Sequence, residues 1–141
     1  MKKLLIFLAI VVIIIAIIFT QYYGYKVEKN TITQENEEYE KYLDQEIYGL
    51  EIGTIINKTI DNNNKNQVQK DEQGIYQQND TNSIEIEIYI KDNDTTYKME
   101  TFYNAGTEQF VQYYGNIKFK CSKIDYHEKS KRVKYLLFEQ V

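Results

Sequence analysis

The segment SIEIEIYIK, residues 83–91, alternates apolar and polar side chains without interruption. Such alternation predicts a β-strand with one buried face and one wet face, and a wet face is typical of antiparallel sheets. Turn residues follow at 92–95. We expect a second strand at Thr96–Tyr103, with Tyr97 and Met99 facing inward. These two strands form the first predicted hairpin.

The C-terminal part of the chain predicts a second hairpin. The residues expected to face inward on its first strand are Ile117, Phe119, Cys121, Ile124 and Tyr126. Their parity shifts after Cys121, which predicts a β-bulge near Ser122. Residues 127–132 are expected to turn, and residues 133–141 to form the last strand. Two inward pairs remain open there: Tyr135 with Leu137, or Leu136 with Phe138.

Upstream of both hairpins, helical spacing of apolar residues predicts one long helix over Glu35–Asn62. Its apolar residues are Tyr39, Leu43, Ile47, Leu50, Ile52, Ile55, Ile56 and Ile60. Gly49 and Gly53 interrupt the pattern. Each glycine costs about 1 kcal/mol relative to alanine inside a helix, so we expect a kink or two shorter helices. The same pair matches small-xxx-small and would let the helix approach the sheet closely.

A short helix at residues 104–114, capped by Asn104 or Thr107, is predicted between the hairpins. It places Phe110, Val111 and Tyr114 on one side. The predicted fold class is therefore α+β. A long helix packs on a four- to five-stranded antiparallel sheet, with one short extra helix.

The N-terminal segment predicts a membrane anchor. Lys2 and Lys3 precede an unbroken apolar run, residues 4–19, and tyrosines follow at positions 22, 23 and 25. Residues 4–23 have about the length that a helix needs to cross a bilayer. Because no small-x-small cleavage pattern follows, an uncleaved signal-anchor is favoured over a cleaved signal. The lysines favour an N-in, C-out single-pass topology. We divide the chain into an anchor, 1–25, and an extracytoplasmic domain, 26–141.

Composition sets further bounds. The chain has 141 residues with 0 Pro, 0 Trp and 14 Tyr, and its codon-biased residue usage indicates an AT-rich bacterial genome. A single cysteine, Cys121, excludes an internal disulfide. The net charge is −4, but residues 117–141 carry seven basic and three acidic side chains, giving +4.

Those seven basic residues form a candidate polyanion-binding site: Lys118, Lys120, Lys123, Lys129, Lys131, Arg132 and Lys134. In one interpretation they bind wall polymers or anionic lipid headgroups. In the other they pair across strands with Glu85, Glu87 and Glu100 on the wet face of the sheet. Strand alternation favours the second interpretation.

No catalytic, cofactor or metal site is predicted. Cys121 and His127 would lie six residues apart on one strand, roughly 20 Å, too far for a catalytic dyad. The stretch Asp92–Asp94 begins like a calcium loop, but tyrosines stand where an EF-hand needs glycine and glutamate. Three N-glycosylation matches, at Asn57, Asn79 and Asn93, are expected by chance in so asparagine-rich a chain. GxSxG, HExxH, P-loop and GxGxxG motifs are absent.

Several stretches together resemble small N-terminally anchored proteins of AT-rich, Gram-positive, clostridia-like bacteria. They are the anchor, Tyr48–Asn63, Glu108–Val111 and Phe119–Cys121. The resemblance implies an anchored envelope domain and no particular activity. The layout is also similar to that of type IV pilins and pseudopilins. Because their leader glycine and the glutamate five residues into the apolar run are absent here, this likeness is architectural only.

The function expected from the sequence is that of a non-catalytic, membrane-anchored binding or assembly component of the cell envelope. Its partners would be the bilayer, through residues 4–23, and an envelope protein, with no nucleic acid. The alternative is a polyanion-binding module that uses the basic C-terminal hairpin. An enzyme is the least favoured class.

The anchor assignment predicts that the mature protein keeps residues 1–25. Intact-mass and N-terminal sequencing of the membrane fraction measure this directly. A new N-terminus between Thr20 and Thr33 would show that the segment is a cleaved signal.

Overall fold

The computed structural model describes residues 1–141 as two compact units, Met1–Glu35 and Asn36–Val141. Helix α1 (Lys2–Glu40) makes up the first unit, and its last residues, 36–40, belong to the second. The apolar side chains of residues 4–19 are exposed along this helix. By length and composition α1 can cross a membrane, which is consistent with single-pass anchoring.

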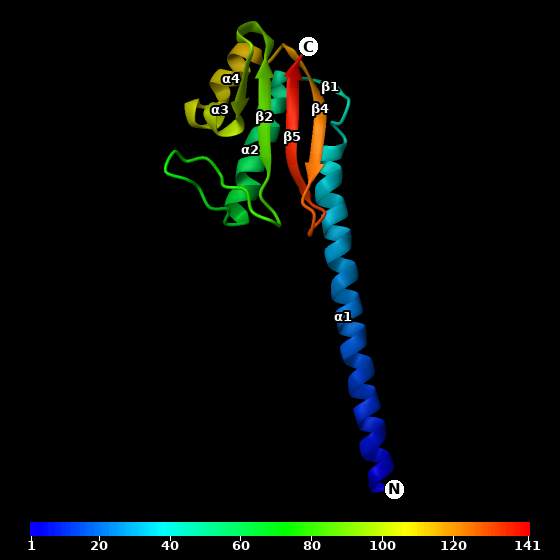
Figure 1. Ribbon diagram of the computed structural model, residues 1–141. Coiled ribbons are helices and arrows are strands. Elements are labelled where there is room, and N and C mark those ends of the chain that lie inside the picture. The colour runs from blue at the N-terminus through cyan, green and yellow to red at the C-terminus, as the bar shows by residue number, and fades with distance from the viewer. The chain divides into compact units, whose positions relative to one another are not determined.

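The second unit contains a five-stranded sheet in the order β1-β4-β5-β2-β3 (Figure 1). Its strands are β1 (Glu46–Tyr48), β2 (Glu85–Ile90), β3 (Thr95–Lys98), β4 (Lys118–Tyr126) and β5 (Val133–Gln140). The α+β class is confirmed. The expectation of a wholly antiparallel sheet is wrong, because β2 and β5 run parallel. Alternation in β2 shows which face is buried, but it contains no information on the direction of the neighbouring strand.

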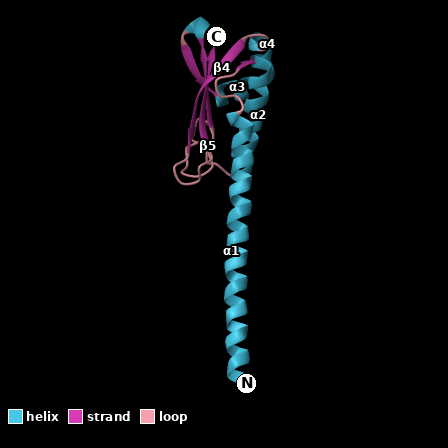
Figure 2. Cartoon of the chain, turned by 90° about the vertical axis from the view of Figure 1, so that its right-hand side faces the viewer, coloured by secondary structure: helices cyan, strands magenta, loops and turns pink.

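Three helices cover one face of this sheet (Figure 2): α2 (Gly49–Lys65), α3 (Met99–Ala105) and α4 (Thr107–Tyr114). A 3₁₀ turn, η1 (Lys91–Asn93), links β2 to β3. The fully buried apolar side chains between the layers are Ile52, Ile56, Ile60, Ile86, Ile88, Ile90, Met99, Phe119, Val133, Leu136 and Phe138. The alternation that predicted β2 is therefore confirmed, since its isoleucines face the helices.

Residues 35–62 contribute to two helices, which is one of the two outcomes expected from the glycines, and the break lies before Gly49. The predicted start at Glu35 is wrong, because α1 runs unbroken from Lys2 to Glu40. Residues 41–48 leave the helical path and supply β1, which pairs with β4. Leu43 and Leu50, predicted to face the core, are 41% and 61% exposed. The periodicity was continuous across the break, because an apolar residue such as Ile47 serves an edge strand as well as a helix.

Gly49 and Gly53 allow a close approach, but to α4 and not to the sheet. A Cβ on Gly49 would lie 2.1 Å from the Tyr114 carbonyl oxygen, and one on Gly53 would lie 2.7 Å from Val111 Cγ2. At Gly49 the obstacle is backbone, so this position requires glycine to keep α2 and α4 in contact, whereas a larger residue at Gly53 would require the Val111 side chain to shift.

The chain between β3 and β4 also differs from the expectation. The strand predicted over Thr96–Tyr103 ends at Lys98, and two short helices follow instead of one. Gly106, with φ 97°, separates them and occupies the position before α4, so neither Asn104 nor Thr107 is the cap. Phe110 is nevertheless buried, as predicted.

The second hairpin forms as predicted, except that Tyr126, expected to face inward, is 42% exposed. The β4–β5 register shifts between Cys121 and Lys123, which is the expected bulge at Ser122. Of the two inward pairs left open, Leu136 and Phe138 are the buried one.

Two asparagines on helices fix the starts of the two parallel strands. Asn63 of α2, fully buried, donates from Nδ2 to the Ile84 carbonyl oxygen (2.8 Å) and accepts the Ile84 N–H at Oδ1 (2.9 Å). Asn36 of α1 repeats this arrangement before β5. Its amide donates to the Lys131 carbonyl oxygen (2.8 Å), and its Oδ1 accepts the Val133 N–H (2.9 Å).

Asn63→Ala should destabilise the domain by about 2–5 kcal/mol, because it leaves a buried N–H and a buried C=O of Ile84 without partners. Asn36→Ala is the matched control. Its site is half-buried, so water can replace the lost bonds and the cost should stay under about 1.5 kcal/mol. Urea unfolding of the full chain in micelles measures both, and equal costs would contradict this account of Asn63.

Candidate functional site

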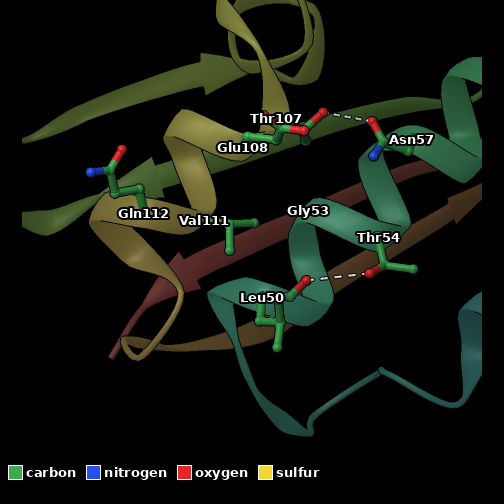
Figure 3. A pocket seen from close by; sticks show the side chains of 8 residues that line it. All are labelled: Leu50, Gly53, Thr54, Asn57, Thr107, Glu108, Val111 and Gln112. Atoms are coloured by element: carbon green, nitrogen blue, oxygen red, sulfur yellow. Dashed lines mark hydrogen bonds between the residues drawn. The ribbon is translucent and has the colours of Figure 1, made fainter.

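An open groove of about 540 Å³ runs between α2 and α4 (Figure 3). Its lining residues are Leu50, Gly53, Thr54, Asn57, Thr107, Glu108, Val111 and Gln112. Val111 points from α4 toward α2 at the floor, where Gly53 leaves room for it (Figure 3). At one end Thr107 Oγ1 donates a hydrogen bond to Asn57 Oδ1 (2.7 Å), which ties the two helices together.

Apolar and neutral polar side chains make up most of the lining of this groove. Leu50 and Val111 supply apolar surface, and two threonines and two amides supply neutral polar groups. Its one charged side chain, Glu108, is exposed and forms no ion pair. A nucleophile with an adjacent base would be needed for covalent catalysis, and neither histidine nor cysteine lines the groove.

The basic residues of β4 are paired, although with other partners than predicted. Lys118 contacts Glu46 (3.1 Å), Lys120 contacts Asp44 (3.3 Å) and Lys123 contacts Asp125 (2.8 Å). The predicted partners Glu85, Glu87 and Glu100 are not used. The reason is the strand order: β1 and β5 flank β4, and β2 lies one strand further away.

Those three glutamates have other contacts. Glu85 pairs with Lys98 (2.8 Å), and Glu87 accepts a hydrogen bond from the Tyr135 hydroxyl (2.7 Å). Glu100 is not on the wet face, since it is buried at the start of α3. One of its oxygens accepts the Tyr76 N–H (3.1 Å), and the other, Oε2, has no hydrogen-bond partner.

The remaining basic residues lie in the β4–β5 turn or, in the case of Lys134, at the start of β5 beside it. Lys129 is 3.8 Å from Asp80, with both side chains mostly exposed. Lys131 is exposed and has a positive φ of 61°. Lys134 is half-buried and forms no ion pair. Arg132 accompanies them in the turn. The structure therefore divides the seven predicted residues into three paired residues on β4 and a group at the turn.

Cys121 and His127 are separate, as their spacing predicts. Cys121 is fully buried on β4, and burial raises the pKa of its thiol to about 11. His127 follows β4 and is also buried, with Nε2 2.7 Å from the Ser83 carbonyl oxygen. This carbonyl fixes the imidazole to the start of β2, a contact that the sequence analysis did not foresee.

The other motifs have structural contacts. Asp94 takes the left-handed conformation (φ 49°) and accepts a hydrogen bond from Tyr89 (2.8 Å). Asn79 Oδ1 accepts three backbone N–H groups, from residues 81, 82 and 83. No group of three or more His, Cys, Asp or Glu side chains could hold a metal ion.

Comparison with known proteins adds no assignment. A scan against protein-family models matches no family, and neither the curated proteins nor the solved structures contain a significant match. The α2–α4 groove was not predicted from the sequence. Its signals were present in Gly53, which was assigned to a kink or to close approach to the sheet, and in the apolar side of residues 104–114, which was given no partner.

The thiol of Cys121 should resist alkylation in the folded protein. With a pKa of about 11, roughly 0.1% of the thiol is ionised at pH 8, and burial blocks access as well. Maleimide labelling of native and urea-unfolded protein, read by mass spectrometry, should show slow and fast reaction respectively. Rapid labelling of the native protein would mean that the thiol is accessible.

Proposed function

We propose that this protein is a membrane-anchored, extracytoplasmic binding component of the bacterial cell envelope, which acts by contact and not by catalysis. The observation that carries the proposal is the α2–α4 groove, with apolar surface, neutral polar groups and one unpaired carboxylate. Residues 4–23 cross the bilayer in this proposal, and Lys2 and Lys3 keep the N-terminus inside. The domain is then available to envelope partners.

The groove favours a partner segment of defined chemistry. Leu50 is 61% exposed at one end and Val111 forms the floor, so an apolar side chain of the partner gains by covering them. Glu108 on the rim favours a lysine or arginine beside that apolar side chain. We therefore propose an envelope protein that presents an apolar residue next to a basic one.

The placement of the reactive side chains supports a non-catalytic role. Cys121 is buried with a raised thiol pKa, and His127 directs Nε2 at a backbone carbonyl. Neither group lines the α2–α4 groove. Glu108 is the one titratable side chain in the groove lining, and no histidine or cysteine lies beside it as a partner.

A photo-crosslinking amino acid at Thr54, in the full chain expressed in its native membrane, tests the groove. We expect a discrete adduct that disappears in Glu108→Lys, because the reversed charge repels the basic residue of the partner. Glu51→Lys is the matched control. It makes the same charge change on an exposed residue of α2 outside the groove lining, and should leave the adduct in place.

Two results would contradict the proposal. One is loss of the adduct in both charge variants, which would indicate a general electrostatic effect. The other is an equal adduct from Tyr113, an α4 residue that is 74% exposed and does not line the groove.

A further inference from the structure

A second hollow, of about 330 Å³, lies at the β4–β5 turn. Its lining comes from two loops and the adjacent strand ends: Asn79, Asp80, Tyr126, His127, Glu128, Lys129 and Lys134. It shares no residue with the α2–α4 groove. Its volume falls in the range of small-molecule pockets, about 300–1,000 Å³.

The walls of this turn cavity are fixed by hydrogen bonds. Asn79 Oδ1 holds three successive backbone N–H groups of residues 81–83. His127 connects to the Ser83 carbonyl (2.7 Å), and Ser130 Oγ donates to the Thr81 carbonyl (2.5 Å). The two loops are thereby held against each other before any ligand arrives, which lowers the ordering cost of binding.

The charges around the cavity differ in exposure. Lys134 is half-buried and has no ion pair, whereas Lys129 and Asp80 are 78% and 85% exposed at their side chains. Glu128 is also exposed. Charges in water are screened over about 8–10 Å at physiological salt, and a partly buried charge acts more strongly. Lys134, the lining lysine that is half-buried and unpaired, is therefore the main contact for a ligand inside the cavity.

We propose that the turn cavity binds a phosphodiester group of an anionic envelope polymer, with Lys134 as the main contact and Lys129 at the rim. Lys129 is within ion-pair distance of Asp80, which leaves Lys134 as the one unpaired cation in the lining, and a single cation matches a singly charged diester better than a doubly charged phosphate. The choice of an envelope polymer rests on the extracytoplasmic location proposed above, whereas the charge preference rests on the cavity alone.

A polymer fits this site better than a membrane surface does. The surface of a bilayer is broad and flat, so it is contacted best by exposed cations that point outward. The lysine of this site, Lys134, is instead half-buried in a hollow. A single repeating unit of a flexible polymer can enter such a hollow. The paired lysines of β4 are exposed and would contribute only screened, non-specific attraction.

To test this, the full chain in phosphatidylcholine nanodiscs is titrated with poly(glycerol phosphate). Calorimetry measures the affinity, and backbone amide NMR shifts locate the binding site. Lys134→Gln should weaken binding about tenfold. Lys118→Gln, the same charge change on a lysine that is paired with Glu46, should weaken it by less than about twofold. The shifts of the unmutated chain should concentrate in residues 79–83 and 126–134. Inorganic phosphate at equal charge concentration should bind less tightly than the diester.

Equal losses in Lys118→Gln and Lys134→Gln, or shifts centred on β4, would overturn the proposal. A second contradicting result is a set of NMR shifts that appears in phosphatidylglycerol nanodiscs without polymer but not in phosphatidylcholine nanodiscs with polymer. That result would make the ligand a lipid headgroup. Glu108→Lys changes the α2–α4 groove and leaves the turn cavity intact. Measuring polymer binding by this variant therefore tests the turn cavity independently of the groove.

Discussion

The hydrogen bonds between Asn63 and Ile84 are the contact on which the rest of the sheet depends. A strand with side-chain period two moves its whole apolar set to the other face when it slips by one residue. By holding both backbone groups of Ile84 to the end of α2, Asn63 sets the register in which Ile86, Ile88 and Ile90 face inward. Strand β2 in turn pairs with both β3 and β5, so an error there would propagate through the sheet.

The end of α1 is part of the domain and cannot be treated as a linker. Tyr39 is buried, and its hydroxyl lies 3.2 Å from Thr59 Oγ1 of α2. Asn36 binds the backbone on either side of Arg132, and the Tyr126 hydroxyl donates to Glu40 (2.7 Å). Residues 36–40 therefore contact α2, β4 and the start of β5. A helix that began only as an anchor would not need these specific polar contacts.

The features that could be predicted from the sequence are those that depend on neighbouring residues of a single segment. The alternation of β2 and the parity shift at Ser122 reflect burial along one strand, and both predictions held. The parallel β2–β5 pair, the β1 strand at Ile47 and the partners of Lys118 depend on which segments meet in space, which no local pattern contains. The early end of β3 at Lys98 has a similar cause, because Met99 is buried whether the backbone there is strand or helix.

The candidate sites show the same limit at the level of charge. The sequence alone showed that the C-terminal segment is rich in basic residues. In the fold, with β1 beside β4, its seven cations form two groups. Lys118 and Lys120 gain carboxylate neighbours from Glu46 and Asp44, whereas the turn keeps a half-buried lysine without one. An anion can bind the unpaired lysine readily, but it binds Lys118 or Lys120 poorly because a paired cation must first give up its carboxylate partner. In the polymer site proposed above, selectivity would therefore arise from the strand order and not from the count of lysines.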